Sequence, residues 1–187
     1  CRSIPMAGSA ACACSAGFMG DAGVITLRPE PLTRERFAPY GDVIDASHDN
    51  VNAMNEARFE RFDDLCQVEM AGGDVAISVT RCRTPTLLPL RVDMVERHPL
   101  GSQAFVPLTP CRMVIVVAPP GEGVNPEDLR AFVTSGRQGI NYHRGTWHMP
   151  LIAFTAGQEF LIVDRRADAP NCEQHELDAV VMLEDAV

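Results

Sequence analysis

The sequence predicts an all-β protein built as a barrel or a sandwich, and three observations support this prediction. From Val24 onward the chain consists of roughly ten short segments that are apolar or alternate between apolar and polar residues. Pro, Gly and other turn residues separate these segments, and little of the chain has the periodicity of a long helix. With 187 residues and 46% hydrophobic content, the chain can bury one substantial core, so we expect a single folded domain.

The expected strands follow one another along the chain at short intervals. The first is VITLRP at 24–29, and each of the others is bounded by turn residues in the same way. The remaining strands are expected at 42–46, 65–70, 75–83, 88–98, 103–108, 112–120, 129–134, 146–154 and 159–165.

Helical structure is expected at only one or two places. A short helix is predicted at 33–42, where Thr33 can cap the start and Pro39 with Gly41 ends the helix. A second helical turn can begin at 126–132, because an Asn-Pro pair precedes it. Both are too short to change the all-β prediction.

Charge and composition exclude several classes of partner. The net charge of −9 argues against nucleic acid and against an anionic membrane surface, because both require a basic face. All 16 basic residues are Arg, which excludes Schiff-base chemistry on Lys and leaves Arg as the only permanent cation for a substrate carboxylate. No apolar run reaches the roughly 18 residues of a membrane span, so a cytoplasmic protein is expected.

The cysteines and the first residues are expected to carry no function. The seven cysteines are scattered without a C-x-x-C pair, so we expect thiols that act as small buried hydrophobes instead of disulfides or a zinc site. Residues 1–18 are rich in Ala, Gly, Ser and Cys and lack the apolar core of a signal peptide. They are expected to be a disordered tail or a segment upstream of the true start, and residues 19–187 to form the single domain.

The first segment with functional potential is ERHPLGSQAFVPL at 96–108. Glu96 and His98 are two residues apart, so on a strand their side chains point to the same face. Gln103 opens the next strand across the PLGS turn, and such a hairpin can direct all three side chains into one barrel mouth.

The second segment is GINYHRGTWHMPL at 139–151, in which His143 and His148 flank a turn at Gly145. Together with the first segment it offers imidazole, carboxylate and amide groups, a plausible ligand set for a first-row divalent metal. Taken singly, each residue also has a structural interpretation. His98 can cap a strand end, Glu96 can form a solvated pair with its neighbour, and His148 can lie at the edge of the core.

These segments resemble the two motifs of the cupin superfamily, H-x-H-x3–4-E and P-x-G-x-x-H. By position, Glu96 stands for the first His, His98 for the second, Gln103 for the Glu and His148 for the His of the second motif. The resemblance implies a metal-binding cavity inside a double-stranded β-helix. The Glu and Gln depart from the usual ligands, and His143 stands where the second motif has Pro.

The chain more specifically resembles the ureidoglycolate lyase family. The resemblance spans roughly residues 25 to 173 and implies a cupin-like jelly-roll barrel with one or two short helices that forms a homodimer. The segments that carry it are LTRERFAPYGDVI, ERFDDL, ERHPLGSQAFVPL, LRAFVTSGRQGINYHRGTWHMPL and FLIVDR with NCE.

The implied reaction eliminates urea from ureidoglycolate and leaves glyoxylate. A base must take the hydroxyl proton while the C–N bond breaks, and an acid must protonate the departing urea nitrogen. The candidates for these catalytic roles are Glu96, His98, His143 and His148.

Other residues are candidates for binding the substrate or a metal. For the substrate carboxylate the candidates are Arg81, Arg97 and Arg144, and for the urea group they are Asn55, Gln103 and Tyr142. The sequence leaves open whether a cofactor is required. A nickel, manganese or zinc ion would be held by Glu96, His98, Gln103 and His148 and would lower the pKa of the substrate hydroxyl.

Three alternative functions share these residues. An amidohydrolase would attack the ureido carbonyl and release ammonia and carbon dioxide, which requires an activated water and usually a tightly held metal. A cupin isomerase or a non-catalytic barrel that binds a small acid is also compatible with the fold. The length of the family-specific segments favours the lyase.

Overall fold

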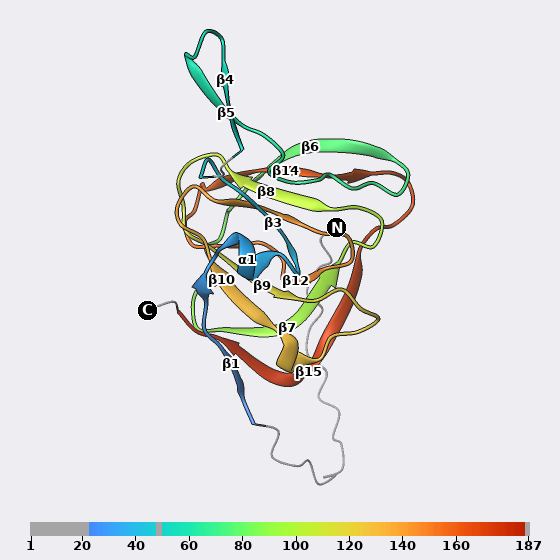
Figure 1. The fold of residues 1–187 in the computed structure, drawn as a ribbon. Helices are drawn as coiled ribbons and strands as arrows, with labels where there is room; N and C mark the ends of the chain where they lie inside the picture. Colours follow the sequence, from blue (N-terminus) through green and yellow to red (C-terminus); the bar gives the residue numbers. More distant parts are fainter. Residues whose placement is uncertain (1–22, 48–49, 186–187) are drawn as a thin grey trace, which may run out of the picture.

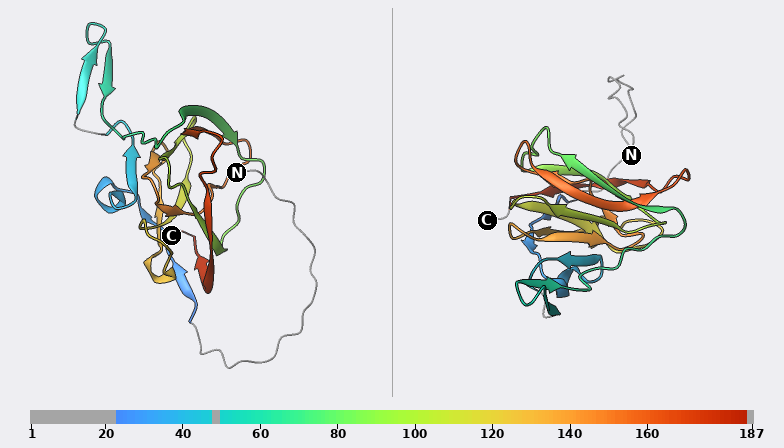
Figure 2. Two further views of the ribbon diagram at one scale, coloured as in Figure 1. Left: turned by 90° about the vertical axis from the view of Figure 1, so that its right-hand side faces the viewer. Right: turned by 90° about the horizontal axis from the view of Figure 1, so that it is seen from above.

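The computed structural model describes residues 23–47 and 50–185, and these form two β-sheets that pack against each other with a hairpin projecting from them (Figure 1). The larger sheet curls around its end of the molecule, and the two further views show the sheets as layers (Figure 2). The all-β, cupin-like prediction is therefore confirmed. The expected segment 1–18 lies outside the described residues.

The larger sheet has eight strands. Seven of them lie in the order β1 (Ile25–Leu27), β15 (Glu173–Leu183), β7 (Leu90–Arg97), β12 (Trp147–His148), β9 (Met113–Ala118), β10 (Arg130–Val133) and β2 (Glu30–Pro31). The eighth, β13 (Ile152–Ala153), pairs with β9 outside this order. Most neighbours are antiparallel, but β1 with β15 and β2 with β10 are parallel.

The smaller sheet has five strands, and a separate hairpin has two. The five, in order, are β3 (Gly41–Ile44), β11 (Gly139–Tyr142), β8 (Gln103–Pro107), β14 (Glu159–Arg166) and β6 (Asp74–Arg81). The hairpin consists of β4 (Val51–Met54) and β5 (Phe59–Phe62).

The centre of the core is β9, whose six residues are all buried. Side chains alternate along a strand, so β9 contributes to two apolar clusters. Ile115 and Val117 join Phe105 and Ile140 of the smaller sheet in the cluster between the sheets. Val114, Val116 and Ala118 join the other cluster, on the opposite face of the larger sheet, which also contains Val92, Val95, Trp147 and Val181. β9, which lies beside β12 in the larger sheet, is therefore packed on both faces.

The two predicted helical turns are present. The helix α1 (Arg34–Phe37) begins after Thr33, whose hydroxyl accepts a hydrogen bond from the backbone N–H of Arg36, and it buries Phe37. The 3-10 turn η1 (Pro126–Asp128) is capped by Asn125 in the same way. Within the described residues, no helix is long and apolar enough to cross a membrane.

The structure differs from the expected elements in two respects. Segment 65–70 is irregular, apart from a bridge between Met70 and Gly101. In addition, β2, β4, β5, β11 and β15 were not predicted, because their charged or turn-forming residues obscure the strand pattern. The four cysteines in the described residues are free, as expected, but they are half-buried instead of buried.

Candidate active site

The candidate site lies between the two sheets, where β7 and β12 meet. His148 is directly opposite Glu96 on β7 and Val117 on β9. Opposite residues in an antiparallel pair point to the same face. Because Val117 belongs to the cluster between the sheets, the side chains of Glu96 and His148 also point into the space between the sheets.

Two further side chains reach this space from the hairpin that follows β7. His98 comes one residue after the strand, and its carbonyl accepts a hydrogen bond from the N–H of Gly145 at 3.0 Å. Gln103 opens β8. Together with Glu96 and His148, they line a cavity of about 340 Å³.

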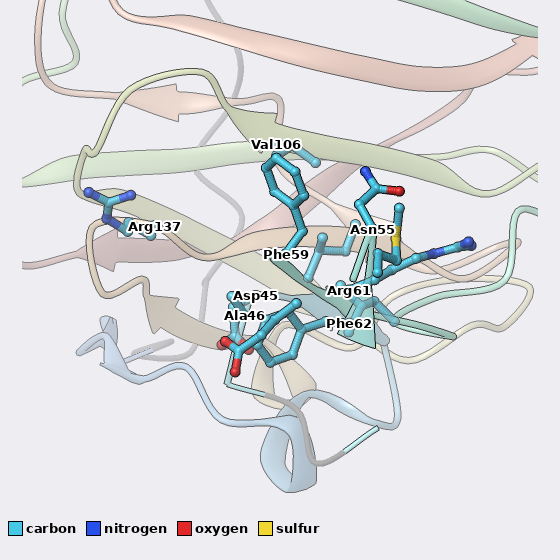
Figure 3. Close-up of a pocket in the computed structure, with 12 residues that line it drawn as sticks. Asp45, Ala46, Asn55, Phe59, Arg61, Phe62, Val106 and Arg137 are labelled. Atoms are coloured by element: carbon cyan, nitrogen blue, oxygen red, sulfur yellow. The ribbon is translucent and has the colours of Figure 1, made fainter. Parts of the chain in front are cut away.

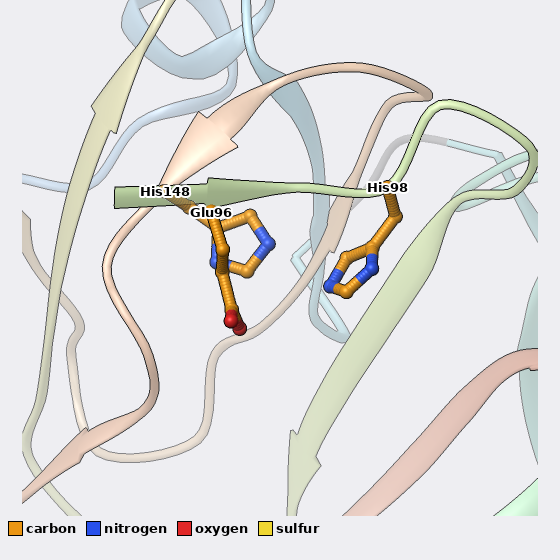
Figure 4. Close-up of side chains that lie close together, drawn as sticks. All are labelled: Glu96, His98 and His148. Carbon is orange, nitrogen blue, oxygen red and sulfur yellow. The ribbon is translucent and has the colours of Figure 1, made fainter. Parts of the chain in front are cut away.

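Three of these side chains converge closely (Figure 4). The nearest ligand atoms of Glu96, His98 and His148 all lie within 4.8 Å of one another. The two imidazole rings are 5.2 Å apart between centroids. The spacing predicted that these residues share one cavity, and the structure places them together.

Hydrogen bonds to backbone carbonyls orient both imidazole rings. The Nδ1 atom of His98 lies 2.5 Å from the carbonyl oxygen of Asn171, and the Nδ1 atom of His148 lies 2.9 Å from the carbonyl oxygen of Met149. A carbonyl only accepts, so each Nδ1 carries the proton when the ring is neutral, and each Nε2 presents a lone pair.

Three buried atoms around the cavity have no hydrogen-bond partner among the described residues. The atoms are the Nε2 of His98, the Nε2 of His148 and the Oε1 of Gln103. A buried polar atom without a partner costs about 1–3 kcal/mol, and native proteins contain few. Three such atoms around one cavity therefore indicate a position that a ligand occupies.

Burial keeps the site in the protonation states that suit ligand binding. Burial, and then the neighbouring His98, lowers the pKa of His148 to about 3, so this ring stays neutral at physiological pH. The ring of Tyr142 stacks on His148 at 4.1 Å between centroids. Burial, and then the charge of Glu96, raises the pKa of Tyr142, so its phenol stays protonated.

The carboxylate of Glu96 is held by a thiol. The Sγ atom of Cys172 donates a hydrogen bond to its Oε2 at 3.4 Å. Burial, and then Glu96, raises the pKa of Cys172 to about 11, so the thiol keeps its proton. Residues 171 and 172 thus hold both His98 and Glu96, one through a carbonyl and the other through a side chain.

The donor set fits a first-row divalent metal. Two imidazole nitrogens, one carboxylate and one amide oxygen are the ligand types that nickel, manganese and zinc accept. The hydrogen bonds from each Nδ1 to a carbonyl are the usual way in which a metal-binding His is oriented. The residues that could hold an ion are therefore Glu96, His98, Gln103 and His148.

Several residues predicted to bind substrate lie away from this cavity. Arg81 is on β6 and pairs with Glu159 at 2.5 Å. Arg97 follows Glu96 directly, so strand alternation turns it to the opposite face, where it covers Trp147 at 4.7 Å. Asn55 lies in the turn of the projecting hairpin. The structure brings none of these three to the cavity.

The second predicted segment is divided between two places. His143 pairs with Asp42 at 3.1 Å, and both side chains are partly exposed. Arg144 donates to the carbonyl of Pro99 at 3.0 Å. Neither residue lines the cavity that contains His148, whereas Tyr142 reaches the cluster through its ring.

The sequence analysis missed the residues that complete the cavity wall, which come from 164–172. Arg165 is the only arginine among the described residues that line the cavity. Its guanidinium donates to the carbonyls of Gly72 and Ala169 at 2.9 and 3.2 Å. The FLIVDR and NCE segments carry part of the family resemblance and include residues of this wall. However, neither residue type nor spacing marked any of their residues as part of the site.

Comparison with known proteins identifies the family and several relatives of this chain. The family model described as ureidoglycolate lyase matches residues 24–184. A ureidoglycolate lyase of Pseudomonas aeruginosa (strain LESB58) is 46% identical over 151 residues, which cover 80% of this chain and 89% of the relative. The ureidoglycolate lyase of Pseudomonas fluorescens (strain SBW25) is 47% identical, covering 80% and 90%. That of Azotobacter vinelandii is 43% identical, also covering 80% and 90%.

Proposed function

The chain belongs to the ureidoglycolate lyase family, and from this premise we propose that its cavity eliminates urea from ureidoglycolate to give glyoxylate. The observation that supports this assignment most directly is the convergence of Glu96, His98 and His148 in one buried cavity. That cavity supplies a carboxylate for proton transfer and two imidazoles beside it.

The proposed reaction balances with a single proton-carrying group. The carboxylate of Glu96 accepts the hydroxyl proton of ureidoglycolate as the C=O bond of glyoxylate forms. The C–N bond breaks, its electron pair stays on nitrogen, and the protonated carboxyl returns the proton to that nitrogen, so urea leaves as a neutral molecule. Positioned acid–base groups of this kind contribute about 10²–10⁴-fold to the rate.

Three residues orient the reactants and Glu96. Arg165 stands at the cavity wall and is the cation that we assign to the substrate carboxylate; to reach it, the guanidinium would exchange its contacts with the carbonyls of Gly72 and Ala169. The thiol of Cys172 donates to one oxygen of Glu96 and thereby orients its carboxylate in the cavity. The ring of Tyr142 covers His148 and excludes water from it.

We further propose that the cavity holds a divalent metal. Glu96, His98, Gln103 and His148 would hold it. The buried atoms of His98, Gln103 and His148 that have no partner among the described residues support this proposal. When bound, such an ion would act as a Lewis acid toward the substrate hydroxyl. Titration of chelated protein with nickel, manganese and zinc, followed by calorimetry, tests binding without reference to turnover.

Product analysis tests the reaction. Enzyme of defined metal content is incubated with racemic ureidoglycolate, and glyoxylate, urea and ammonia are quantified together. The lyase releases one urea for each glyoxylate and no ammonia. Ammonia in place of urea would identify an amidohydrolase and contradict the proposal. Absence of turnover would also contradict it and would favour a non-catalytic protein that binds a small acid.

The remaining features follow the family resemblance. We propose that the protein acts in the cytoplasm as a homodimer, with ureidoglycolate as its small-molecule ligand. Nucleic acid and membrane surfaces are not expected partners, because the net charge is −9.

A further inference from the structure

We propose that Arg97 is a positioning residue, which aligns the groups of the site without touching the substrate. It makes its contacts on the face of the larger sheet that points away from the cavity, and its partners there are neighbours of site residues. We call this face the back of the sheet, and we call Arg97 with Trp147, Glu173 and Gly121 the rear clamp. The inference rests on the lyase reaction proposed above, in which Glu96 transfers the proton.

Two members of the rear clamp directly adjoin site residues in the sequence. Glu96 and His148 are opposite each other where β7 pairs with β12, so Arg97 and Trp147 are the next opposite pair of this antiparallel register. Side chains alternate along a strand, so this second pair faces the back. Trp147 accordingly belongs to the apolar cluster on that face. The position of one pair therefore constrains the position of the other.

The third member repeats this arrangement at the start of β15. Glu173 lies opposite Arg97 in the pairing of β15 with β7. The Nε and Nη2 atoms of Arg97 lie 2.7 and 2.6 Å from its carboxylate. The preceding residue, Cys172, donates its thiol proton to Glu96 on the cavity side. Residues 172 and 173 thus hold the end of β7 from both faces.

The guanidinium of Arg97 joins these segments directly. It lies 4.7 Å from the ring centroid of Trp147, within the range of a cation–π interaction. The carbonyl of Gly121 accepts one hydrogen bond from Nη1 of Arg97 and another from the indole Nε1 of Trp147, the latter at 3.1 Å. The side chain of Arg97 is only 16% exposed, so solvent and salt weaken these contacts little.

The site requires such support because β12 contributes little backbone pairing of its own. This strand has two residues, and its described pairing with β7 is that of His148 with Glu96. The ligand atoms of the cluster lie within 4.8 Å of one another, and a misplacement of about 1 Å can lower a rate by about 10²-fold. The rear clamp limits such a slip, because β12 cannot move along β7 without separating Arg97 from Trp147.

Arg112 provides a matched control elsewhere in the chain. Its guanidinium lies 5.2 Å from the ring centroid of Phe154 and pairs with Asp185, so it has the same chemistry as the rear clamp. Neither Arg112 nor Phe154 lines the cavity of the site. Arg61 and Arg137 are less suitable, because they line a separate groove of about 750 Å³ beside the β4–β5 hairpin (Figure 3). Their replacement would alter that groove as well.

Steady-state kinetics of Arg97→Met, Arg97→Lys and Arg112→Met tests the proposal. We expect kcat to fall about ten-fold in Arg97→Met, because the reacting groups lose their alignment. KM should change by less than about two-fold, because Arg97 does not line the cavity. Lys keeps a cation near Trp147 but lacks the planar fork of Arg, so kcat should fall about three-fold in Arg97→Lys. Arg112→Met should retain the wild-type kcat and KM.

Three outcomes would overturn the positioning role. A rise in KM at unchanged kcat would place Arg97 on the substrate. Wild-type kcat per folded molecule in both Arg97 variants, with a lower melting temperature, would leave this residue a role in stability alone. A loss of kcat of equal size in Arg112→Met would show that the effect does not depend on the rear clamp. If Arg97→Met does not fold, Arg97→Lys decides alone.

Hydrogen exchange measures the rear clamp without turnover. The backbone amides of residues 147–149 should exchange about ten-fold faster in Arg97→Met than in the wild type, because β12 is held less firmly on β7. Arg112→Met should leave their exchange unchanged. Unchanged exchange in Arg97→Met would overturn the clamp at any level of turnover. A wild type that forms no urea, but whose exchange responds to Arg97→Met, would contradict the proposed function and retain the clamp.

Discussion

His143 and His148 stand five residues apart around one turn, yet the structure gives them opposite environments. His148 is 1% exposed, its Nδ1 bonds to a carbonyl, and its Nε2 has no partner in the described part of the chain. His143 is partly exposed and pairs with the carboxylate of Asp42. The chemical type of a side chain is therefore a weaker guide to function than the atom that its surroundings leave unsatisfied.

The cause of the difference lies in the strands that the two residues meet. His148 belongs to β12, which lies between β7 and β9, so burial on both sides is imposed by the sheet. His143 follows β11, where its backbone N–H bonds to the carbonyl of Tyr40 and its ring lies beside β3. One position is internal to the fold, and the other lies at its surface.

The largest effect that would sharpen this comparison is on turnover. Replacing His98 or His148 with Ala removes an imidazole from the cluster, and we expect kcat to fall by about 10²-fold or more. Metal affinity should fall in the same variants if they ligate an ion. Steady-state kinetics and calorimetry measure both. Activity per folded molecule that equals the wild type would remove these residues from the reacting centre.

A second prediction concerns acid stability. Burial holds the pKa of His148 near 3 in the folded chain, whereas an unfolded His titrates near 6.5. Between these values the unfolded chain binds a proton that the folded chain excludes, so the free energy of unfolding falls as pH drops through this window. The slope is at most about 1.4 kcal/mol per pH unit.

Urea denaturation of chelated protein at pH 7 and pH 5 measures this slope. His148→Gln should reduce the loss of stability between the two pH values, because the titrating ring is gone. His143→Gln is the matched control and should retain the loss. An unchanged slope in His148→Gln would show that the ring is not the source.

Strand periodicity explains how much of the site was predictable. Residues two apart on a strand share a face, which places Glu96 with His98 and excludes Arg97 from the same cavity. Gln103 was found because a short turn leads directly into the next strand. The capping of α1 by Thr33 was equally local. Each of these predictions needed only the neighbouring residues.

The remaining parts of the site depend on contacts that the sequence does not encode locally. The carbonyl of Asn171 orients His98 across 73 residues, and a backbone carbonyl has no residue type by which to recognise it. The choice of Arg165 among 16 arginines depends on which strand reaches the cavity. In β15, charged residues alternate along a strand whose pairing to β7 becomes visible only in the fold.

A third and smaller effect is expected at Cys172. Removing the thiol that donates to Glu96 releases one carboxylate oxygen, and loss of such a supporting hydrogen bond typically costs about 10-fold or more in metal affinity or activity. Cys172→Ala should therefore weaken both, while Cys172→Ser keeps a donor and should restore most of the loss. Equal behaviour of the two variants would indicate packing and not hydrogen bonding.

The smallest effect is expected at His143 and tests the other half of the comparison. An exposed ion pair contributes about 0–1 kcal/mol, so His143→Ala should lower the free energy of unfolding by no more than that amount. Because its ring lies outside the cavity of His148, kcat should change by less than about three-fold, well below the range for a positioned acid or base. The control is Asp42→Asn, which breaks the same pair from the other side and should behave alike. A fall in kcat approaching that of His148→Ala, with stability intact, would place His143 at the reacting centre, where its side chain would have to swing away from Asp42 to reach the substrate.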